Sequence, residues 1–244
     1  MPGPVALVGS GEFLDVMRPI DEALLAGRPR RAVFLPTAAA EEGPERVGYW
    51  IELGRVHFAA MGVEAVPLRV LDRADADRVD LATAVGGAGL VYLSGGNPGY
   101  LADTLRGTAV WRAILDAHEA GAALAGCSAG ACALSRVSDD FRDPGRFTGR
   151  GLGVVPRAAV IPHFDRFSGF APHFTDELLR TAPRDAEVVG IDEETALVGG
   201  PERFEVMGRQ AVWLLGRDGT RRRYGPGEQI SLTGPPARAK DAVD

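Results

Sequence analysis

The chain has 244 residues, of which 45% are hydrophobic and 25% are charged, with a formal net charge of −6. These values are typical of a globular protein and argue against a disordered or membrane-embedded chain. The acidic balance also argues against an extended phosphate-binding surface, so no nucleic-acid partner is expected.

Short aliphatic runs alternate with longer segments of helical period in the first half of the chain. This alternation is typical of βαβ units and predicts a parallel sheet. The predicted strands are Val5–Val8, Ala32–Pro36, Glu64–Leu68, Leu90–Ser94 and Ala122–Gly126. The predicted helices are Phe13–Leu25, Glu45–Met61, Ala74–Val85, Tyr100–Arg106 and Val110–Ala120. Gly62, Gly107 and Gly121 are expected in left-handed conformation near helix ends.

After about residue 150 the pattern changes to closely spaced strands, which we expect to extend the same sheet. The predicted strands are Ala158–Ile161, Val188–Ile191, Ala196–Val198, Phe204–Met207, Val212–Leu215 and Gln229–Leu232. The basic run Arg221–Arg223 is interpreted as a solvated strand or turn. The expected fold is α/β, a three-layer open and mostly parallel sheet with helices on both faces and antiparallel strands added by the C-terminal part. Residues 1–235 are predicted to form one domain, and residues 236–244 a frayed tail.

The cellular compartment is inferred from the N-terminus and the cysteines. The apolar run Val5–Val8 is too short for a signal sequence or a membrane span, so no membrane partner is expected. Cys127 and Cys132 are too few for a disulfide framework and lack further metal-ligand spacing. Both observations predict a cytoplasmic protein without a metal.

The segment Gly126-Cys127-Ser128-Ala129-Gly130 lies between a predicted apolar strand and an Ala/Leu helix. A G-x-S-x-G sequence in this context predicts a nucleophile elbow, with Ser128 on a strained turn and small neighbours that allow strand and helix to approach. The Ala129 N–H at the helix start would stabilise a developing oxyanion. The alternative is a small-residue packing turn that contains a serine by chance.

A second glycine turn, Gly95-Gly96-Asn97-Pro98, follows the predicted strand Leu90–Ser94. Ligands of open α/β sheets bind at the carboxyl ends of strands, so the Gly96 N–H is a candidate second oxyanion donor and Asn97 a candidate for orienting substrate. An ordinary turn with Pro98 at the first helical position is an equal alternative.

A serine nucleophile needs a base, and four histidines are present. His57 and His118 fall within helical patterns and are interpreted as structural or surface residues. His163 directly follows a predicted strand, whereas His173 opens a helical run as a helix-entry or rim residue. We therefore favour His163 as the base.

The base needs an acid that orients it, and Asp192-Glu193-Glu194 ends the strand Val188–Ile191. Glu193 is the preferred residue. Asp139, Asp140 and Asp165 are competitors, and the first two are interpreted as solvated loop acids.

Several motifs in this order resemble the aspartyl dipeptidase (dipeptidase E) and cyanophycinase family of serine peptidases, which are similar in fold to class I glutamine amidotransferases. The matching motifs cover about residues 5–215. They are Gly9-Ser10-Gly11-Glu12, Phe34-Leu35-Pro36-Thr37, Ser94-Gly95-Gly96-Asn97, Gly126-Cys127-Ser128-Ala129-Gly130, Gly151-Leu152-Gly153 with Pro162-His163-Phe164, and Gly190-Ile191-Asp192-Glu193-Glu194-Thr195-Ala196-Leu197.

The resemblance implies a Ser-His-Glu triad of Ser128, His163 and Glu193, with oxyanion donors at Gly96 and Ala129. It implies acyl transfer on a small peptide substrate without metal or organic cofactor. Family members cleave Asp-containing dipeptides or an aspartate-arginine polymer, and the segment 163–175 does not closely match either kind. Arg166 could pair with an acidic substrate side chain or form a surface salt bridge.

Two further hypotheses about activity stay open at this point. A glutamine amidotransferase-like thiol nucleophile would use Cys127 or Cys132, although Cys127 is one position from the elbow apex. A binding module with the same fold and no turnover is the non-enzyme alternative. A homodimer is the default oligomer, and no sequence feature selects an interface for it.

Overall fold

The computed structural model describes residues 1–138, 146, 148–166 and 172–233, without the side chains of residues 172–174. The predicted tail, residues 236–244, therefore lies outside the described residues. Within the described part, no helix is both long and apolar enough to cross a bilayer.

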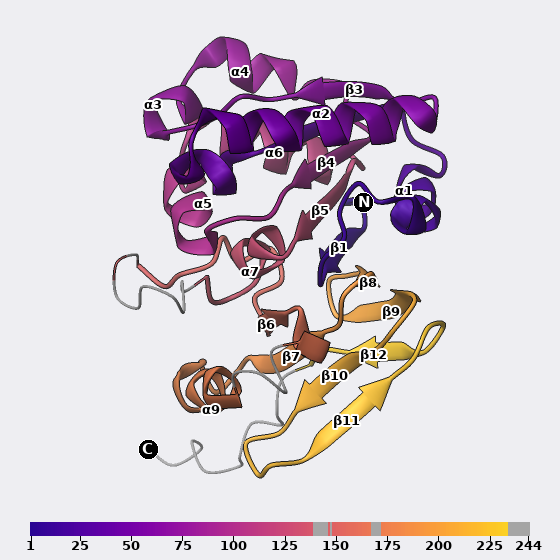
Figure 1. Cartoon of the computed structure of the whole chain (residues 1–244), viewed down its shortest axis with the longest axis vertical. Coiled ribbons are helices and arrows are strands. Elements are labelled where there is room, and N and C mark those ends of the chain that lie inside the picture. Colours follow the sequence, from indigo (N-terminus) through magenta and orange to yellow (C-terminus); the bar gives the residue numbers. More distant parts are fainter. Residues whose placement is uncertain (139–145, 147, 167–171, 234–244) are drawn as a thin grey trace.

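An eight-stranded sheet has the order β12-β9-β8-β1-β5-β4-β2-β3, with β3 near the top of the molecule in Figure 1 and β12 in its lower half. Its five parallel strands are β1 (Val5–Val8), β2 (Arg31–Leu35), β3 (Glu64–Pro67), β4 (Leu90–Leu93) and β5 (Ala123–Cys127). Three antiparallel strands extend it beyond β1, namely β8 (Thr195–Gly199), β9 (Arg203–Gly208) and β12 (Gln229–Ser231). The predicted mostly parallel α/β sheet is confirmed.

Helices cover both faces of this sheet. They are α1 (Arg18–Leu25), α2 (Pro44–Ala60), α3 (Arg73–Ala76), α4 (Val79–Ala84), α5 (Pro98–Leu105), α6 (Ala109–Glu119) and α7 (Ala129–Leu134), with 3-10 turns η1 (Asp15–Met17) and η2 (Thr37–Glu42). Successive strand residues point to opposite faces. Ala6 therefore packs in one core cluster with Phe58 of α2, whereas Leu7 packs in the other with Ile114 of α6.

Two predicted helices differ in detail. The segment predicted as one helix over Ala74–Val85 is divided into α3 and α4. The Asp72 side chain caps α3, which has only one turn, and α4 begins after the extended residue Arg78. The first predicted helix begins late, at Arg18, since Phe13 has a φ of 64°. The three predicted helix-end glycines, Gly62, Gly107 and Gly121, do have positive φ values.

A second sheet corrects the expectation that all later strands extend the first one. It has the order β11-β10-β7-β6. Its strands are β6 (Ala158–Pro162), β7 (Glu187–Ile191), β10 (Val212–Leu215) and β11 (Arg221–Tyr224), and α9 (Pro172–Thr181) connects β6 to the parallel β7. After β7 the chain crosses to the first sheet, where β8 pairs with β1. It then returns to the second sheet, where β10 pairs with β7. Apolar alternation predicts that a strand forms but not which strand it pairs with.

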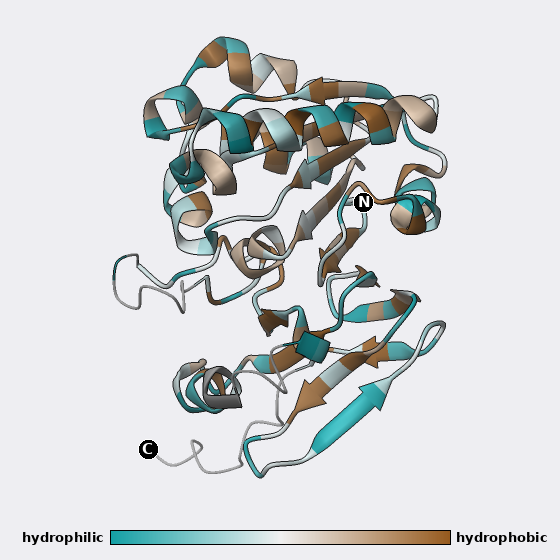
Figure 2. Ribbon diagram, in the orientation of Figure 1, coloured by the Kyte–Doolittle hydropathy of each residue, from teal (hydrophilic) through white to brown (hydrophobic). Residues whose placement is uncertain are grey.

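The two sheets share part of one core. Val160 of β6 and Val189 of β7 belong to the same buried cluster as Leu7 of β1. Arg221–Tyr224, by contrast, forms the exposed edge strand β11, which is teal in Figure 2 beside the brown β10. Charged residues on an edge strand discourage pairing with another chain. The basic run is therefore a solvated strand, one of the two alternatives expected for it.

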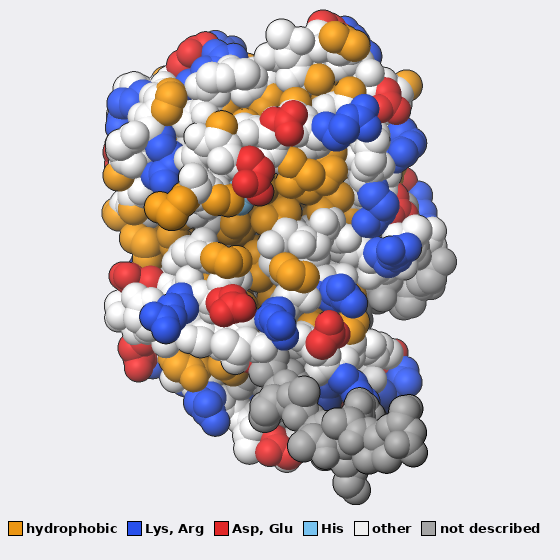
Figure 3. All heavy atoms as spheres, turned by 180° about the vertical axis from the view of Figure 1, so that it is seen from behind, with side chains coloured by type: hydrophobic (Ala, Val, Ile, Leu, Met, Phe, Trp, Pro, Cys, Tyr) orange, Lys and Arg blue, Asp and Glu red, His pale blue; other side chains and the backbone are white. Residues whose placement is uncertain are grey.

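The rear of the molecule presents hydrophobic side chains among acidic and basic ones (Figure 3). The large apolar side chains most exposed in the described residues are Met1, Leu14, Tyr49, Val56 and Val79. They are scattered along the chain and define no interface by themselves. The single-domain organisation and the homodimer both stay predictions.

Candidate active site

Ser128 occupies a strained turn between β5 and α7. Its φ of 51° and ψ of −108° lie outside the regions that ordinary residues favour. The Ser128 N–H donates to the Val8 carbonyl at 2.9 Å, and its own carbonyl accepts from the Cys132 N–H at 3.1 Å. The turn is therefore held from β1 on one side and by the first turn of α7 on the other.

Glycines at positions 126 and 130 permit this turn. A Cβ atom on Gly126 would lie 2.4 Å from the Gly130 carbonyl carbon, and one on Gly130 would lie 2.3 Å from the Leu93 carbonyl oxygen. Both distances are far shorter than any normal carbon contact, so the strand and the helix approach as closely as the sequence predicts.

Ser128 Oγ lies 2.9 Å from His163 Nε2, and His163 Nδ1 lies 3.0 Å from Glu193 Oε1. His163 directly follows β6 with a φ of 55°, and Glu193 lies two residues beyond the end of β7. Because β6 and β7 are neighbouring parallel strands, the residues after them meet at one edge of the second sheet. The side chains of His163 and Glu193 are 30% and 28% exposed, so solvent and ligand can reach them.

The other two acids next to Glu193 are engaged elsewhere. The buried Asp192 accepts from the Trp213 Nε1–H and from the Ala211 N–H, and burial raises the pKa of its carboxyl. Glu194 forms an ion pair with Arg209 at 2.8 Å. Glu193 is accordingly the member of this cluster that faces the imidazole.

Asp165 and Gln210 hold the main chain of Glu193 in place. The Glu193 N–H donates to Asp165 Oδ1 at 2.9 Å, and the Glu193 carbonyl accepts from Gln210 Nε2 at 3.0 Å. The same Gln210 amide also reaches Asp165 Oδ2 at 3.3 Å. The sequence analysis considered Asp165 as an alternative to Glu193 for the acid that orients the base, whereas nothing in the sequence singled out Gln210.

Arg166 lies beside the same carboxylate. Its Nε donates to Glu193 Oε2 at 3.3 Å, while its side chain is 75% exposed. The surface salt bridge expected as one alternative is thus present. The guanidinium nevertheless remains accessible to a ligand carboxylate.

The amides of Gly96 and Ala129 lie in the turns that adjoin Ser128. Ala129 is the first residue of α7, where backbone N–H groups have no acceptor within the helix. A Cβ atom on Gly95 would lie 3.6 Å from Ser128 Cβ, which brings the Gly95-Gly96 turn against the serine. Within the described part of the chain, neither amide donates a hydrogen bond.

The Asn97 side chain is engaged within the protein at both polar ends. Its Oδ1 caps α5 by accepting from the Tyr100 N–H at 3.0 Å, and its Nδ2 donates to Glu41 at 3.2 Å. Asn97 is 8% exposed. Any contact of Asn97 with substrate would be additional to these bonds.

The model of peptidase family S51 matches residues 5–207 of the chain. The chain belongs to this family. A crystal structure of a peptidase from an acI-B1 Actinobacterium is 37% identical, with a TM-score of 0.86, and the match covers 95% of this chain and 97% of that one. This S51 chain is accordingly a serine-type peptidase, as the sequence motifs predict.

A putative peptidase E protein from Listeria monocytogenes EGD-e is similar in fold, with 19% identity and a TM-score of 0.64. That match covers 86% of this chain and all (100%) of the other. A search of curated proteins finds no match.

Both cysteines are buried free thiols in this S51 peptidase. Burial, and next the Glu12 carboxylate, raise the pKa of Cys127 well above its usual range, and burial raises the pKa of Cys132 to about 12. Because the thiolate is the reactive form, neither group is suited to be a nucleophile at neutral pH. The geometry thus argues against the thiol alternative.

The remaining candidates from the sequence do not join Ser128. His57 is buried against Asp21, with Nε2 and Oδ2 2.7 Å apart, and His118 Nδ1 lies 3.1 Å from the Ala122 carbonyl oxygen. Both are structural residues, as expected. Asp139, Asp140 and the side chain of His173 lie outside the described residues.

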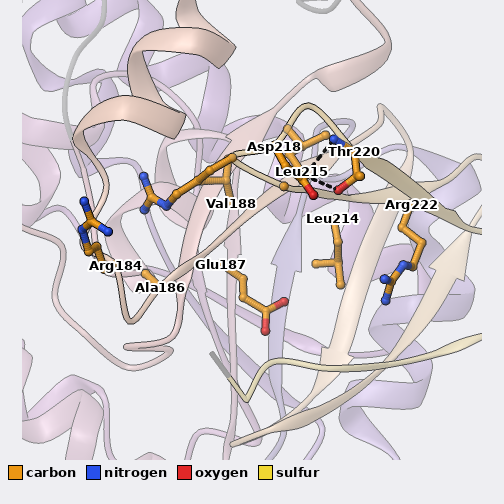
Figure 4. A pocket seen from close by; sticks show the side chains of 11 residues that line it. Arg184, Ala186, Glu187, Val188, Leu214, Leu215, Asp218, Thr220 and Arg222 are labelled. Carbon is orange, nitrogen blue, oxygen red and sulfur yellow. Dashed lines mark hydrogen bonds between the residues drawn. The ribbon is translucent and has the colours of Figure 1, made fainter. Parts of the chain in front are cut away.

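A pocket of about 640 Å³ lies on the second sheet, and none of the predicted site residues lines it. Figure 4 shows acidic and basic side chains around it, including Arg184, Glu187, Asp218 and Arg222, together with the apolar Val188 and Leu214. The Thr220 hydroxyl donates a hydrogen bond to Asp218 Oδ1 at 2.7 Å.

No group of three or more His, Cys, Asp or Glu side chains in the described residues is arranged to hold a metal ion.

Proposed function

We propose that this S51 peptidase hydrolyses small peptides through an acyl-enzyme on Ser128, with His163 as general base and Glu193 as the orienting acid. The observation that carries the proposal is the continuous hydrogen-bonded path from Ser128 Oγ through the imidazole to Glu193, with steps of 2.9 and 3.0 Å. A serine hydroxyl becomes an effective nucleophile when a positioned base accepts its proton.

The proposed reaction has two halves. Ser128 Oγ attacks the amide carbonyl while His163 Nε2 takes the hydroxyl proton, and the Gly96 and Ala129 amides bind the oxyanion. His163 then donates its proton to the leaving amine as the C–N bond breaks. In the second half, water gives a proton to His163 and attacks the acyl carbonyl. His163 then returns a proton to Ser128 Oγ as the acyl C–O bond breaks, which releases the acid and restores the enzyme.

We propose substrates with an acidic side chain near the scissile bond, such as Asp-containing dipeptides. The exposed Arg166 guanidinium next to Glu193 supports this assignment, since guanidinium groups pair bidentately with carboxylates. An aspartate-arginine polymer presents similar chemistry and is the alternative substrate. A cytoplasmic location is part of the proposal, because both cysteines are free thiols, which fits a reducing compartment.

The test combines turnover and labelling. Purified protein is given Asp-X dipeptides, isoaspartyl peptides and the aspartate-arginine polymer, and amine release is measured for the wild type and Ser128→Ala. A fluorophosphonate probe is applied to both in parallel. We expect amine release and labelling by the wild type only. A folded wild type that takes no label would contradict the serine mechanism and favour the binding-module alternative.

A further inference from the structure

Glu12 is a buried acid next to the proposed active site, and the mechanism above does not use it. It lies in the loop that follows β1 and is 5% exposed. Oε1 accepts from the Gly95 N–H at 2.8 Å, and Oε2 accepts from the Cys127 thiol at 2.8 Å. One carboxylate thus connects the turn after β4 with the last residue of β5.

The bond to Gly95 fixes one end of the turn that carries the Gly96 amide. The other end is fixed by the Asn97 N–H, which donates to the Ala38 carbonyl at 2.7 Å. Gly96 between them has a φ of 140°, and a Cβ atom there would lie 2.3 Å from the Ala38 oxygen. Two anchors on neighbouring residues leave the Gly96 peptide little freedom to rotate.

The bond to Cys127 fixes the residue directly before Ser128. Because the buried thiol has a strongly raised pKa, it keeps its proton and remains a donor to Glu12. The carboxylate oxygens therefore hold the proposed oxyanion turn and the elbow at a set separation. A geometric change of about 1 Å in such a site reduces rates strongly, about 10²-fold.

We propose that Glu12 is a positioning residue that sets the Gly96 N–H relative to Ser128 Oγ. The inference rests on the proposed acyl transfer at Ser128, and it assigns to Glu12 no contact with substrate. What matters is the acceptor oxygen that faces the Gly95 N–H. A glutamine, which keeps this oxygen, should preserve the function, whereas an alanine should not.

The experiment measures the second-order rate of fluorophosphonate labelling, which needs no known peptide substrate. In this reaction the Ser128 Oγ–P bond forms, fluoride leaves, and His163 takes the serine proton. Because the phosphoryl oxygen occupies the oxyanion site, labelling depends on the Gly96 donor. Glu12→Ala, Glu12→Gln and the control Glu64→Ala, an exposed acid on β3, are compared with the wild type at temperatures where each is folded.

We expect Glu12→Ala to label about 10-fold to 100-fold more slowly. This loss is smaller than the roughly 10²-fold to 10³-fold cost of removing an oxyanion donor, because the Gly96 N–H is displaced and not removed. Glu12→Gln should stay within about 3-fold of the wild type, and Glu64→Ala should be unchanged. Rescue by glutamine separates positioning from a general effect of the charge. With a peptide substrate, Glu12→Ala should lower kcat and leave KM nearly constant.

Labelling of folded Glu12→Ala at the wild-type rate would overturn the inference, and so would a Glu12→Gln variant that is as slow as the alanine variant. If Glu12→Ala does not fold, Glu12→Asp replaces it, because a side chain shorter by one methylene cannot reach both partners. Slow labelling of folded Glu12→Asp supports the inference, and wild-type labelling contradicts it. A wild type that takes no label instead refutes the proposed nucleophile.

Discussion

His163 Nδ1 and Glu193 Oε1 lie 3.0 Å apart although the two residues are 30 positions apart in the sequence. They follow neighbouring parallel strands, β6 and β7, so the second sheet sets their separation. The bond directs Nε2 of the same ring at Ser128 Oγ, 2.9 Å away. The second sheet therefore supplies the proposed base and acid, and the first sheet supplies the nucleophile.

Replacing Glu193 by Gln should preserve the packing but remove the negative charge that stabilises the imidazolium. We expect kcat for peptide hydrolysis to fall by roughly 10²-fold to 10⁴-fold with KM little changed. Steady-state kinetics with the peptide found in the substrate screen checks this. Undiminished kcat in Glu193→Gln would show that another group orients His163.

Asp165→Ala should reduce kcat because the Glu193 N–H loses its acceptor and the Asp165–Gln210 contact is lost as well. We expect a decrease of about 10-fold, in line with a small displacement of a positioned group. Asp165→Asn keeps the acceptor for the Glu193 N–H and is the matched control. Its kcat should lie closer to that of the wild type, and equal losses in both variants would contradict this role.

Arg166→Ala tests the proposed substrate class. For an Asp-X peptide, kcat/KM should fall about 10-fold more than for the matching Asn-X peptide, because only the carboxylate forms a charged pair with the guanidinium. Any effect of the lost Arg166–Glu193 contact is common to both peptides and cancels in the ratio. Equal losses on the two peptides would exclude Arg166 as the acid-binding group.

Asn97→Ala should destabilise the protein by about 0.5–2 kcal/mol, the usual cost of removing an N-cap. Asn97→Ser keeps a capping oxygen and should recover most of this free energy of unfolding. Urea denaturation of both variants provides the measurement. If Asn97 also contacts substrate, KM will rise in both variants regardless of their stability.

The two thiols should be unreactive in the native state at pH 8 and should both react with Ellman's reagent after unfolding. The raised pKa of Cys132, about 12 against 9.0 for an unperturbed thiol, also predicts a loss of stability in base. The native state retains the proton that the unfolded chain releases, so this stabilisation is complete below pH 9 and is lost as pH rises toward 12.

The measurement is the free energy of unfolding of the wild type and Cys132→Ala between pH 9 and 11. The wild type should lose more stability over this interval, by at most about 1.4 kcal/mol per pH unit. Equal slopes for the two proteins would contradict the predicted thiol contribution.

Much of the fold could be predicted from local patterns. A β-strand run such as Val5–Val8 and the glycine signals at helix ends are properties of neighbouring residues, so the sequence indicates them directly. The elbow was also predictable, because Gly126 and Gly130 meet steric demands within one turn of Ser128. The sequence by itself therefore determined the α/β class and the turn that carries the serine.

Tertiary structure alone decided how the strands divide into two sheets and which side chains meet. Strand periodicity does not specify a pairing partner, so the separate sheet of β6, β7, β10 and β11 was not foreseen. Likewise, Glu12 lies 115 positions from Cys127, and Gln210 lies 17 positions from Glu193. Contacts across such separations depend on the relative placement of whole elements, which the shared core of the two sheets establishes.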